Sequence, residues 1–264
     1  MFKLNLKNVK PDTLNPYYYS AYMLWNRLSW DLKIDSFISR SRLKALRNSY
    51  LGKKAVIICN GPSLLKSDLS LLSGVYTFGL NKINLLFDKT NFRPSCIVAI
   101  NQYVIEQNIE FFNKTSIPIF IDSFSSHLVK TRKNVCFLHT SLQGKFARDC
   151  SMSIFQGGTV TFVAIQLAFH MGFKEVALIG CDHNFTSKGP ANKLVESSDR
   201  DKDHFDPNYF SGGVMWQLPD LALSEYSYSM AKEAYELAVR KIFNATEGGK
   251  LEIFPRISLK DFVS

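Results

Sequence analysis

Six short and almost uninterrupted apolar runs follow one another from residue 53, and they constrain the fold more than any other feature. They are AVIIC (55–59), YTFGL (76–80), CIVAI (96–100), IPIFI (117–121), VCFL (135–138) and EVALIG (175–180). Strands covered on both faces have this character, whereas strands with one face in water alternate apolar and polar residues. The runs therefore predict a buried parallel sheet.

Longer segments of helical period accompany these runs. The clearest is TVTFVAIQLAFHMGF (159–173), which Gly172 should end, and a second long helix is expected from about Pro219 to Phe243. Strands that alternate with helices predict an α/β fold, here a single Rossmann-like, doubly wound parallel sheet with helices on both faces. We expect this domain over residues 53–264, with a polar lid at about 183–218.

Residues 1–52 differ in composition from the rest and are expected to form a basic helical segment. They hold nine Lys or Arg against three Asp, in a chain of formal net charge +9. They also hold an aromatic cluster that includes Tyr17, Tyr18, Trp25 and Trp30. Two interpretations are open: the aromatics pack on the main domain, or they lie at a membrane surface beside anionic lipid. No nucleic-acid-binding motif accompanies the charge, so no nucleic-acid partner is expected.

The sequence also bears on the compartment. No apolar run approaches the roughly 20 residues of a membrane-spanning helix, and the N-terminus lacks the apolar core of a signal peptide. The five cysteines form no CxxC pair, which favours buried free thiols in a reducing compartment over a metal site. A cytoplasmic protein is expected, with peripheral attachment to the cytoplasmic face of the inner membrane as a further expectation.

Polar residues follow four of the predicted strands. They are Asn60-Gly61-Pro62-Ser63, Asn81, Asn101 and Asp182-His183. In doubly wound sheets ligands bind outside the carboxyl ends of the strands, so these residues should meet at one crevice. The plainer alternative is that each Asn only caps or turns the chain. Gln156-Gly157-Gly158-Thr159 opens the best helix and offers free backbone N–H groups that suit a phosphate.

These motifs, read in order, carry a family resemblance over roughly residues 53–255. NGPSL, FGLN, VAIN, GGTV, GFKEVALIGCD and a His-containing lid resemble the bacterial family 42 sialyltransferases and the related MptE-like proteins. The latter group includes pterin pyrophosphokinases and flagellin-modifying Maf glycosyltransferases. The resemblance implies that the nucleotide of a CMP-sugar is held by Asn60, Gly61, Pro62, Ser63, Asn81, Asn101, Gly157, Gly158 and Thr159.

The same resemblance implies a lid histidine as general base. His204 in DKDHFDPNYFSGG is the best match, with Asp206 expected to orient its ring, and His183 beside Asp182 is the alternative. Imidazole titrates near neutral pH, so one His can take the acceptor proton. The tyrosines that bind the leaving phosphate in family 42 are missing after Asp182. That role is left open among His183, Lys188, Lys193, Arg200 and Tyr209.

The expected function is an inverting glycosyltransferase. It would transfer sialic acid, Kdo or another nonulosonate from a CMP-activated donor to a glycan or lipid-linked glycan acceptor. No cofactor beyond this donor is expected, and no metal, because no carboxylate cluster matches a metal-dependent glycosyltransferase motif. Two alternatives stay open: an MptE-like diphosphotransferase that uses ATP, Mg²⁺ and a pterin, and a non-catalytic nucleotide-binding protein.

Overall fold

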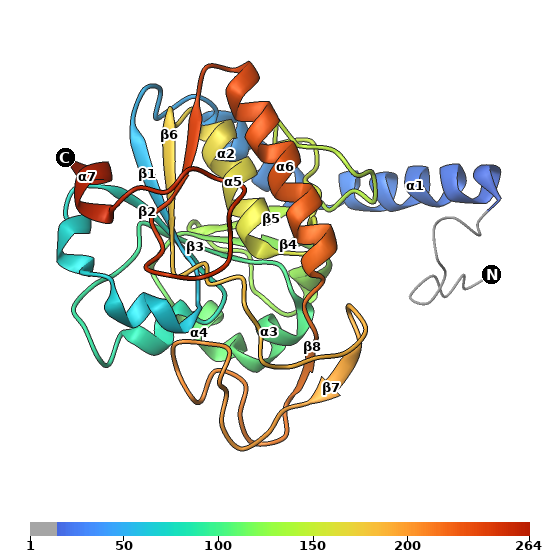
Figure 1. The fold of residues 1–264 in the computed structure, drawn as a ribbon. Helices are drawn as coiled ribbons and strands as arrows, with labels where there is room; N and C mark the ends of the chain where they lie inside the picture. The colour runs from blue at the N-terminus through green and yellow to red at the C-terminus, as the bar shows by residue number, and fades with distance from the viewer. Residues whose placement is uncertain (1–14) are drawn as a thin grey trace.

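A seven-stranded parallel sheet forms the centre of the protein (Figure 1). The structure is a computed structural model and describes residues 15–264. The strand order is β5-β4-β3-β2-β1-β6-β9, so the chain winds outward from β1 in both directions. The strands are β1 (Lys54–Ile58), β2 (Tyr76–Leu80), β3 (Cys96–Ala99), β4 (Ile119–Asp122), β5 (Val135–Leu138), β6 (Glu175–Ile179) and β9 (Lys241–Asn244). The expected doubly wound α/β fold is confirmed.

Helices cover both faces of the sheet. One face is covered by α2 (Ile34–Leu46), α5 (Val160–Met171) and α6 (Leu221–Leu237). The other is covered by α3 (Gln102–Gln107), α4 (Ile109–Lys114), α7 (Leu259–Val263) and the 3-10 turns η3 (Pro62–Lys66), η4 (Leu69–Leu72) and η5 (Ile83–Leu86). In β1, Ala55 and Ile57 face the first layer while Val56 and Ile58 face the second. Both faces are buried, which explains the uninterrupted apolar runs.

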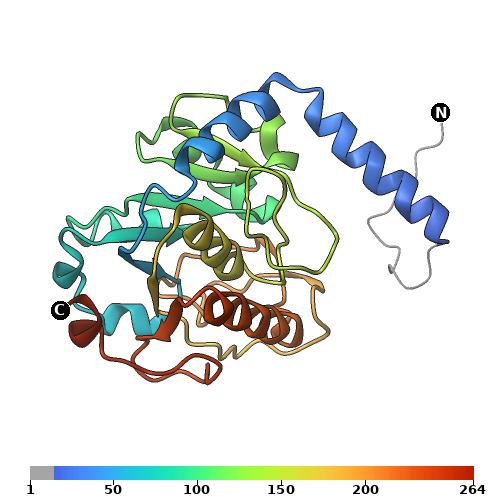
Figure 2. The ribbon, with the colours of Figure 1, turned by 90° about the horizontal axis from the view of Figure 1, so that it is seen from above.

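The helix expected at 159–173 is α5. The side chain of Thr159 caps it by accepting a hydrogen bond from the backbone N–H of Thr161. Gly172 ends it with φ of 96°, a left-handed conformation that glycine adopts without strain. Eleven of its twelve residues are buried, because the helix lies between the sheet and α6 (Figure 2).

The helix expected to run to Phe243 is shorter, and this prediction was wrong at its end. α6 ends at Leu237, and the backbone N–H groups of Ala238 and Arg240 both bond to the carbonyl of Tyr235. Val239 lies between them with φ of 56°. The next residues form β9, which pairs with β6 at the sheet edge. Alternating burial of Ile242 and Asn244 shows a strand period that the helical interpretation overlooked.

The N-terminal segment forms two helices, α1 (Pro16–Asp31) and α2, and α1 extends away from the body (Figures 1 and 2). Lys3, Lys7, Lys10 and Asp12 of the predicted basic segment lie outside the described residues. Within residues 15–264, no helix has the length and apolar character needed to cross a membrane. All five cysteines are buried and unpaired.

Candidate functional site

A cavity of about 280 Å³ lies at the carboxyl ends of four neighbouring strands. Its wall contains Asn60 after β1, Asn81 after β2, Asn101 after β3 and Asp182 after β6. The sheet order reverses between β1 and β6, where ligands of doubly wound folds bind. The structure thus brings together the four strand ends that the sequence singled out.

Two of the asparagines keep unused hydrogen-bonding capacity. Asn60 is 7% exposed, and its amide nitrogen donates to the carbonyl of Leu80 at 3.0 Å. The Oδ1 atoms of Asn60 and Asn81 are buried and have no partner among the described residues. Asn101 behaves differently, because its Oδ1 caps α3 by accepting from Tyr103 N at 2.9 Å. Buried acceptors without partners are costly, so a donor group of a ligand is the natural partner for Asn60 and Asn81.

The loop after β1 packs tightly against the end of β6. The backbone N–H of Gly61 donates to the carbonyl of Gly180 at 2.9 Å, and a Cβ at Gly61 would meet Asp182 Oδ2 at 1.9 Å. Ser63 donates from Oγ to the same Asp182 oxygen at 2.8 Å. Gly61 lines the cavity, whereas Pro62 opens the 3-10 turn behind it. Pro62 and Ser63 therefore shape the loop from outside the cavity wall.

The glycine loop before α5 supplies a second wall. Gly157 and Gly158 have φ of 60° and 74°, and a Cβ at Gly157 would meet Phe162 and Ser227 at 2.5 Å. Gly158 and Thr159 line the cavity, and Gly157 lies just outside its lining. The N-terminus of α5 therefore faces the cavity with the positive end of its dipole, although the N–H groups of Thr159, Thr161 and Phe162 already have partners within the loop. This arrangement suits an anionic group.

The lid contributes a histidine whose ring is held on two sides. The ring of His204 stacks on the ring of Tyr209, with the two centroids 3.9 Å apart and an interplanar angle of 1°. The carboxylate of Asp201 lies 2.8 Å from His204 Nδ1. A proton on Nδ1 then leaves Nε2 as a hydrogen-bond acceptor. His204 lines the cavity with its side chain 14% exposed.

The prediction that Asp206 orients the His204 ring was wrong. Asp206 pairs instead with Lys89, whose Nζ lies 2.5 Å from its carboxylate. Asp201, three residues before His204, accepts from the ring. The three-residue spacing that favours local Asp side-chain turns was the signal for Asp201, and sequence reasoning missed it.

His183 also reaches the cavity. It has φ of 50°, and its Nε2 lies 2.9 Å from Glu225 Oε1 on α6. Glu225 is exposed, so this pair lies at the rim of the cavity. Asp182 and His183 thus both line the cavity, where the chain leaves the end of β6.

Contacts from the body hold the lid over the cavity. The backbone N–H of Phe205 donates to the carbonyl of Asn60 at 2.8 Å. Lys82, directly after Asn81, donates from Nζ to the carbonyl of Tyr209 and to Gln107 Oε1, both at 2.7 Å. Burial lowers the pKa of Lys82 to about 8. The antiparallel pair β7 (Leu194–Glu196) and β8 (Met215–Gln217) forms the outer part of the lid.

Sequence reasoning missed the contribution of α6. Ser224 and Tyr228, one helical turn apart, line the cavity opposite the strand ends. Small polar residues on the buried face of a predicted helix were the available signal. Of the candidate phosphate donors, Lys188 and Arg200 line a neighbouring hollow of about 390 Å³, and neither they nor Lys193 line the cavity. Tyr209 is buried behind His204 and does not line the cavity either.

A larger hollow of about 1040 Å³ lies at the opposite edge of the sheet. Two of its three basic side chains are hydrogen-bonded: Lys54 donates to the carbonyl of Phe262, and Arg93 donates to the carbonyls of Thr90, Phe92 and Phe87. The third, Lys53, lies 5.7 Å from the centre of the Tyr50 ring. Within residues 15–264, no group of three or more His, Cys, Asp or Glu side chains is placed to hold a metal ion. The strand-end cavity is therefore the better candidate site.

Comparisons with known proteins address the family. A search of curated proteins finds no match. A solved Maf glycosyltransferase from Magnetospirillum magneticum AMB-1 is 15% identical, with a TM-score of 0.49 over 86% of this chain. The present chain spans only 40% of that protein. The family profile described as 6-hydroxymethylpterin diphosphokinase MptE-like matches residues 32–188, which is more than half of the chain, and the protein therefore belongs to the MptE-like family.

Proposed function

We propose that the protein is a nucleotide-dependent glycosyltransferase that uses a CMP-activated nonulosonate such as sialic acid or Kdo. The observation that carries the proposal is His204, which lines the same cavity as the strand-end asparagines and whose ring is held from behind by the Asp201 carboxylate. A base held by a carboxylate next to a nucleotide-sized crevice is the arrangement that sugar transfer to a hydroxyl requires. Membership of the MptE-like family supports the broader assignment to transferases.

The donor would lie between the strand ends and α5. The unpartnered Oδ1 atoms of Asn60 and Asn81 would accept hydrogen bonds from the base or ribose. The phosphate would lie at the N-terminus of α5 beside Gly158 and Thr159, where the helix dipole favours negative charge. Asp182 would accept from a ribose hydroxyl with the oxygen that Ser63 does not use.

The reaction would be a single displacement. The Nε2 atom of His204 takes the proton of an acceptor hydroxyl, and that oxygen forms a bond to the anomeric carbon. The bond between the anomeric carbon and the phosphate oxygen breaks, and CMP leaves with the electron pair. The configuration inverts at the anomeric carbon. Asp201 stabilises the imidazolium that results and keeps the correct tautomer during turnover.

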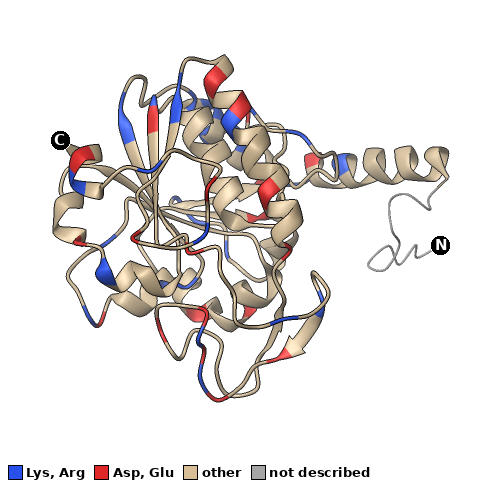
Figure 3. Cartoon of the chain, in the orientation of Figure 1, with Lys and Arg blue, Asp and Glu red and all other residues tan. Residues whose placement is uncertain are grey.

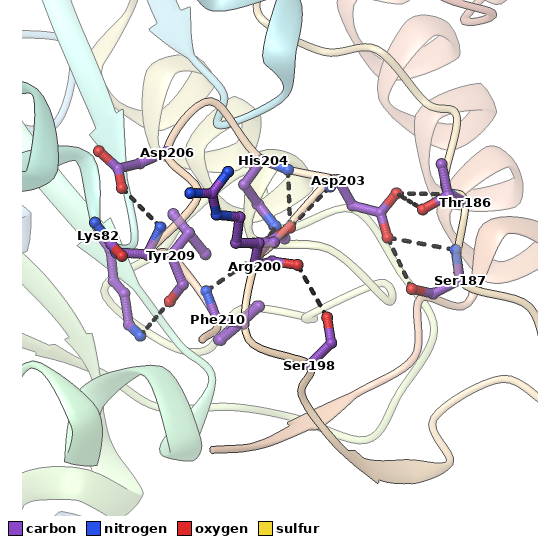
Figure 4. A network of polar contacts seen from close by, with 12 residues as sticks. Lys82, Thr186, Ser187, Ser198, Arg200, Asp203, His204, Asp206, Tyr209 and Phe210 are labelled. Atoms are coloured by element: carbon purple, nitrogen blue, oxygen red, sulfur yellow. Dashed lines mark hydrogen bonds and ion pairs between the residues drawn. The ribbon is translucent and has the colours of Figure 1, made fainter. Parts of the chain in front are cut away.

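Diphosphate transfer from ATP to a pterin is the second candidate, because the family profile is named for that activity. That chemistry relies on Mg²⁺ held by carboxylate oxygens and substrate phosphates. Near the cavity, both oxygens of Asp203 accept from Thr186 and Ser187, as Figure 4 shows. Both oxygens of Asp201 are also used, which leaves few carboxylate oxygens for an ion. The matched region also ends at residue 188, before the part of the lid that carries His204.

A melting-temperature panel separates the two candidates. A ligand that binds only the folded state raises stability by about 2.7 kcal/mol at 100 times its Kd. CMP should therefore raise the melting temperature more than AMP, GMP or UMP, and ATP with Mg²⁺ should have little effect. A clear stabilisation by ATP with Mg²⁺ and none by CMP would favour the diphosphotransferase. Stabilisation by CMP with no release of CMP from CMP-sugars would leave a nucleotide-binding protein.

A further inference from the structure

Helix α1 is attached to the body along one side only. Trp30 near its C-terminal end is 5% exposed, and Asn26 Oδ1 lies 2.9 Å from His139 Nε2 in the loop after β5. Arg27 pairs with Asp31 at 2.8 Å on the same flank. The rest of the helix projects from the body (Figures 1 and 2). The polar and buried residues of α1 thus share the side that faces the protein.

The opposite side of α1 is apolar and faces solvent. At 100° per residue, an arc of roughly 120° contains only apolar or aromatic residues. They are Tyr17, Tyr18, Ala21, Leu24, Trp25 and Leu28, with Leu32 at the C-cap. Tyr17 is 85% exposed, Trp25 69% and Leu24 62%. We call these seven residues the outer face of α1. Figure 3 shows no charged residue on the distal part of the helix.

Two further exposed apolar residues follow the outer face in the chain. Ile34 and Phe37, at the start of α2, are 79% and 78% exposed. Exposed apolar side chains are normal when scattered, but a continuous stripe of this kind marks an interaction surface. Tyrosine and tryptophan are the side chains enriched where a protein meets the boundary of a bilayer, because each joins an apolar ring to a polar tip.

The charge around the outer face matches an anionic surface. Residues 15–52 hold six Lys or Arg and two Asp. Asp31 is neutralised by Arg27 and Arg40, and Asp35 accepts from Thr131. Lys33 turns toward the body, where its Nζ donates to Ser126 Oγ at 3.4 Å and lies 5.9 Å from the centre of the Trp30 ring. Lys44 on α2 is exposed, and no carboxylate in residues 15–264 pairs with it. Cations that flank an apolar helix face are the pattern of helices that lie in a bilayer surface.

A second copy of the chain is a poorer occupant. Sixteen residues of helix span about 24 Å, and a helix is about 10 Å wide. One such face paired with its own copy buries well under the ~1,200 Å² that stable interfaces need. A planar bilayer surface needs no shape complementarity and accepts a lone projecting helix.

We propose that α1 docks the protein on an anionic lipid surface through its outer face, with Lys44 against the headgroups. This would hold the protein at a membrane, whatever reaction the cavity performs. Docking is therefore independent of the proposed transferase chemistry, and its test does not require turnover.

Co-sedimentation with vesicles tests the proposal. Wild-type protein should sediment with vesicles of phosphatidylcholine mixed with phosphatidylglycerol, and added salt should weaken this binding. The double variant Leu24→Glu/Leu28→Glu should bind at least about tenfold more weakly, because two apolar side chains are lost from the contact. The control Leu237→Glu/Val239→Glu adds the same charge at two exposed apolar positions at the end of α6 and should bind like wild type.

Tryptophan fluorescence locates the contact. The emission of Trp25 should shift to shorter wavelength on vesicles and be quenched by brominated lipid. Trp25→Phe should remove that signal while the protein still sediments. No sedimentation of wild type, or equal loss in the α6 control, overturns the proposal. A doubled mass without vesicles that Leu24→Glu/Leu28→Glu abolishes would instead identify a second copy as the occupant.

Discussion

Replacing Asp201 by asparagine should separate the rate of sugar transfer from the binding of CMP. The Asp201 carboxylate accepts four hydrogen bonds within the lid. Oδ1 accepts from the backbone N–H groups of Asp203 at 2.8 Å and His204 at 3.1 Å. Oδ2 accepts from His204 Nδ1 at 2.8 Å and from the backbone N–H of Phe210 at 3.1 Å. Asparagine keeps the shape but offers only one oxygen, and its NH₂ group must replace the other.

The size of the effect follows from these contacts. If the new NH₂ group faces His204, it donates to Nδ1 and drives the ring proton to Nε2, where a general base needs a lone pair. Loss of general-base assistance lowers kcat by about 10²–10⁴-fold. The two hydrogen bonds that Oδ2 accepts, from His204 Nδ1 and from the N–H of Phe210, are lost. Each bond to a charged acceptor contributes about 1.5–3 kcal/mol, and water at the partly exposed ring reduces this, so the free energy of unfolding should fall by about 2–4 kcal/mol.

The assay measures kcat and KM for transfer from a CMP-sugar, CMP affinity by calorimetry, and unfolding in denaturant. CMP affinity should stay within about twofold, because Asp201 does not line the cavity. Asp206→Asn is the matched control, since Asp206 is buried in the same lid but bonds Lys89. It should lose stability yet keep kcat within about tenfold. Wild-type kcat in Asp201→Asn, with the normal loss of stability, would refute the role assigned to the pair.

Three further predictions concern the loop, the lid and pH. Gly61→Ala should lower the free energy of unfolding by about 1–3 kcal/mol and weaken CMP binding, because its Cβ would overlap Asp182. Lys82→Met should speed hydrogen exchange in the lid, because the carbonyl of Tyr209 loses its anchor on the body. Burial lowers the pKa of His139 to about 4 from 6.5, so its unfolded form binds protons more tightly and stability should fall as pH drops from about 6.5 to about 4.

Each of these three predictions has its own control or contradicting result. Gly144→Ala should be nearly neutral, because the nearest atoms lie 3.8 Å from its Cβ; equal losses at both glycines would contradict the packing argument. Unchanged lid exchange in Lys82→Met would show that other contacts hold the lid. His139→Gln should flatten the acid limb of the stability curve measured by denaturant unfolding at a series of pH values. A limb as steep as that of wild type would assign it to other groups.

The sheet and the strand-end asparagines could be predicted because both follow from local patterns. Continuous apolar runs identified β1 to β6, and the rule that parallel strands end at one edge placed Asn60, Asn81 and Asn101 together. The edge strand β9 could not be separated from α6 in this way. A four-residue run after a long helix shares its apolar residues with the helical period, and only the left-handed turn at Val239 breaks the helix.

The position of the lid in the sequence could be predicted from its composition, but the contacts within it could not. Its polar residues indicated an exposed segment, but the choice between Asp201 and Asp206 depends on backbone turns that a sequence does not display. The contribution of Tyr228 depends on how α6 packs across α5, which is a long-range contact. Packing of the N-terminal aromatics on the main domain is confirmed for Trp30, which is buried, whereas Trp25 is exposed and its contact with a membrane stays a prediction.

The measurement that tests the central claim most directly is turnover of a CMP-sugar beside calorimetric CMP binding for His204→Ala and His183→Ala. Both histidines line the cavity, but only His204 has a buried carboxylate on its ring. His204→Ala should lower kcat by about 10²–10⁴-fold with CMP affinity close to wild type, and His183→Ala should retain most activity. Wild-type turnover in His204→Ala with an inactive His183→Ala would contradict the account and transfer the role of base to His183.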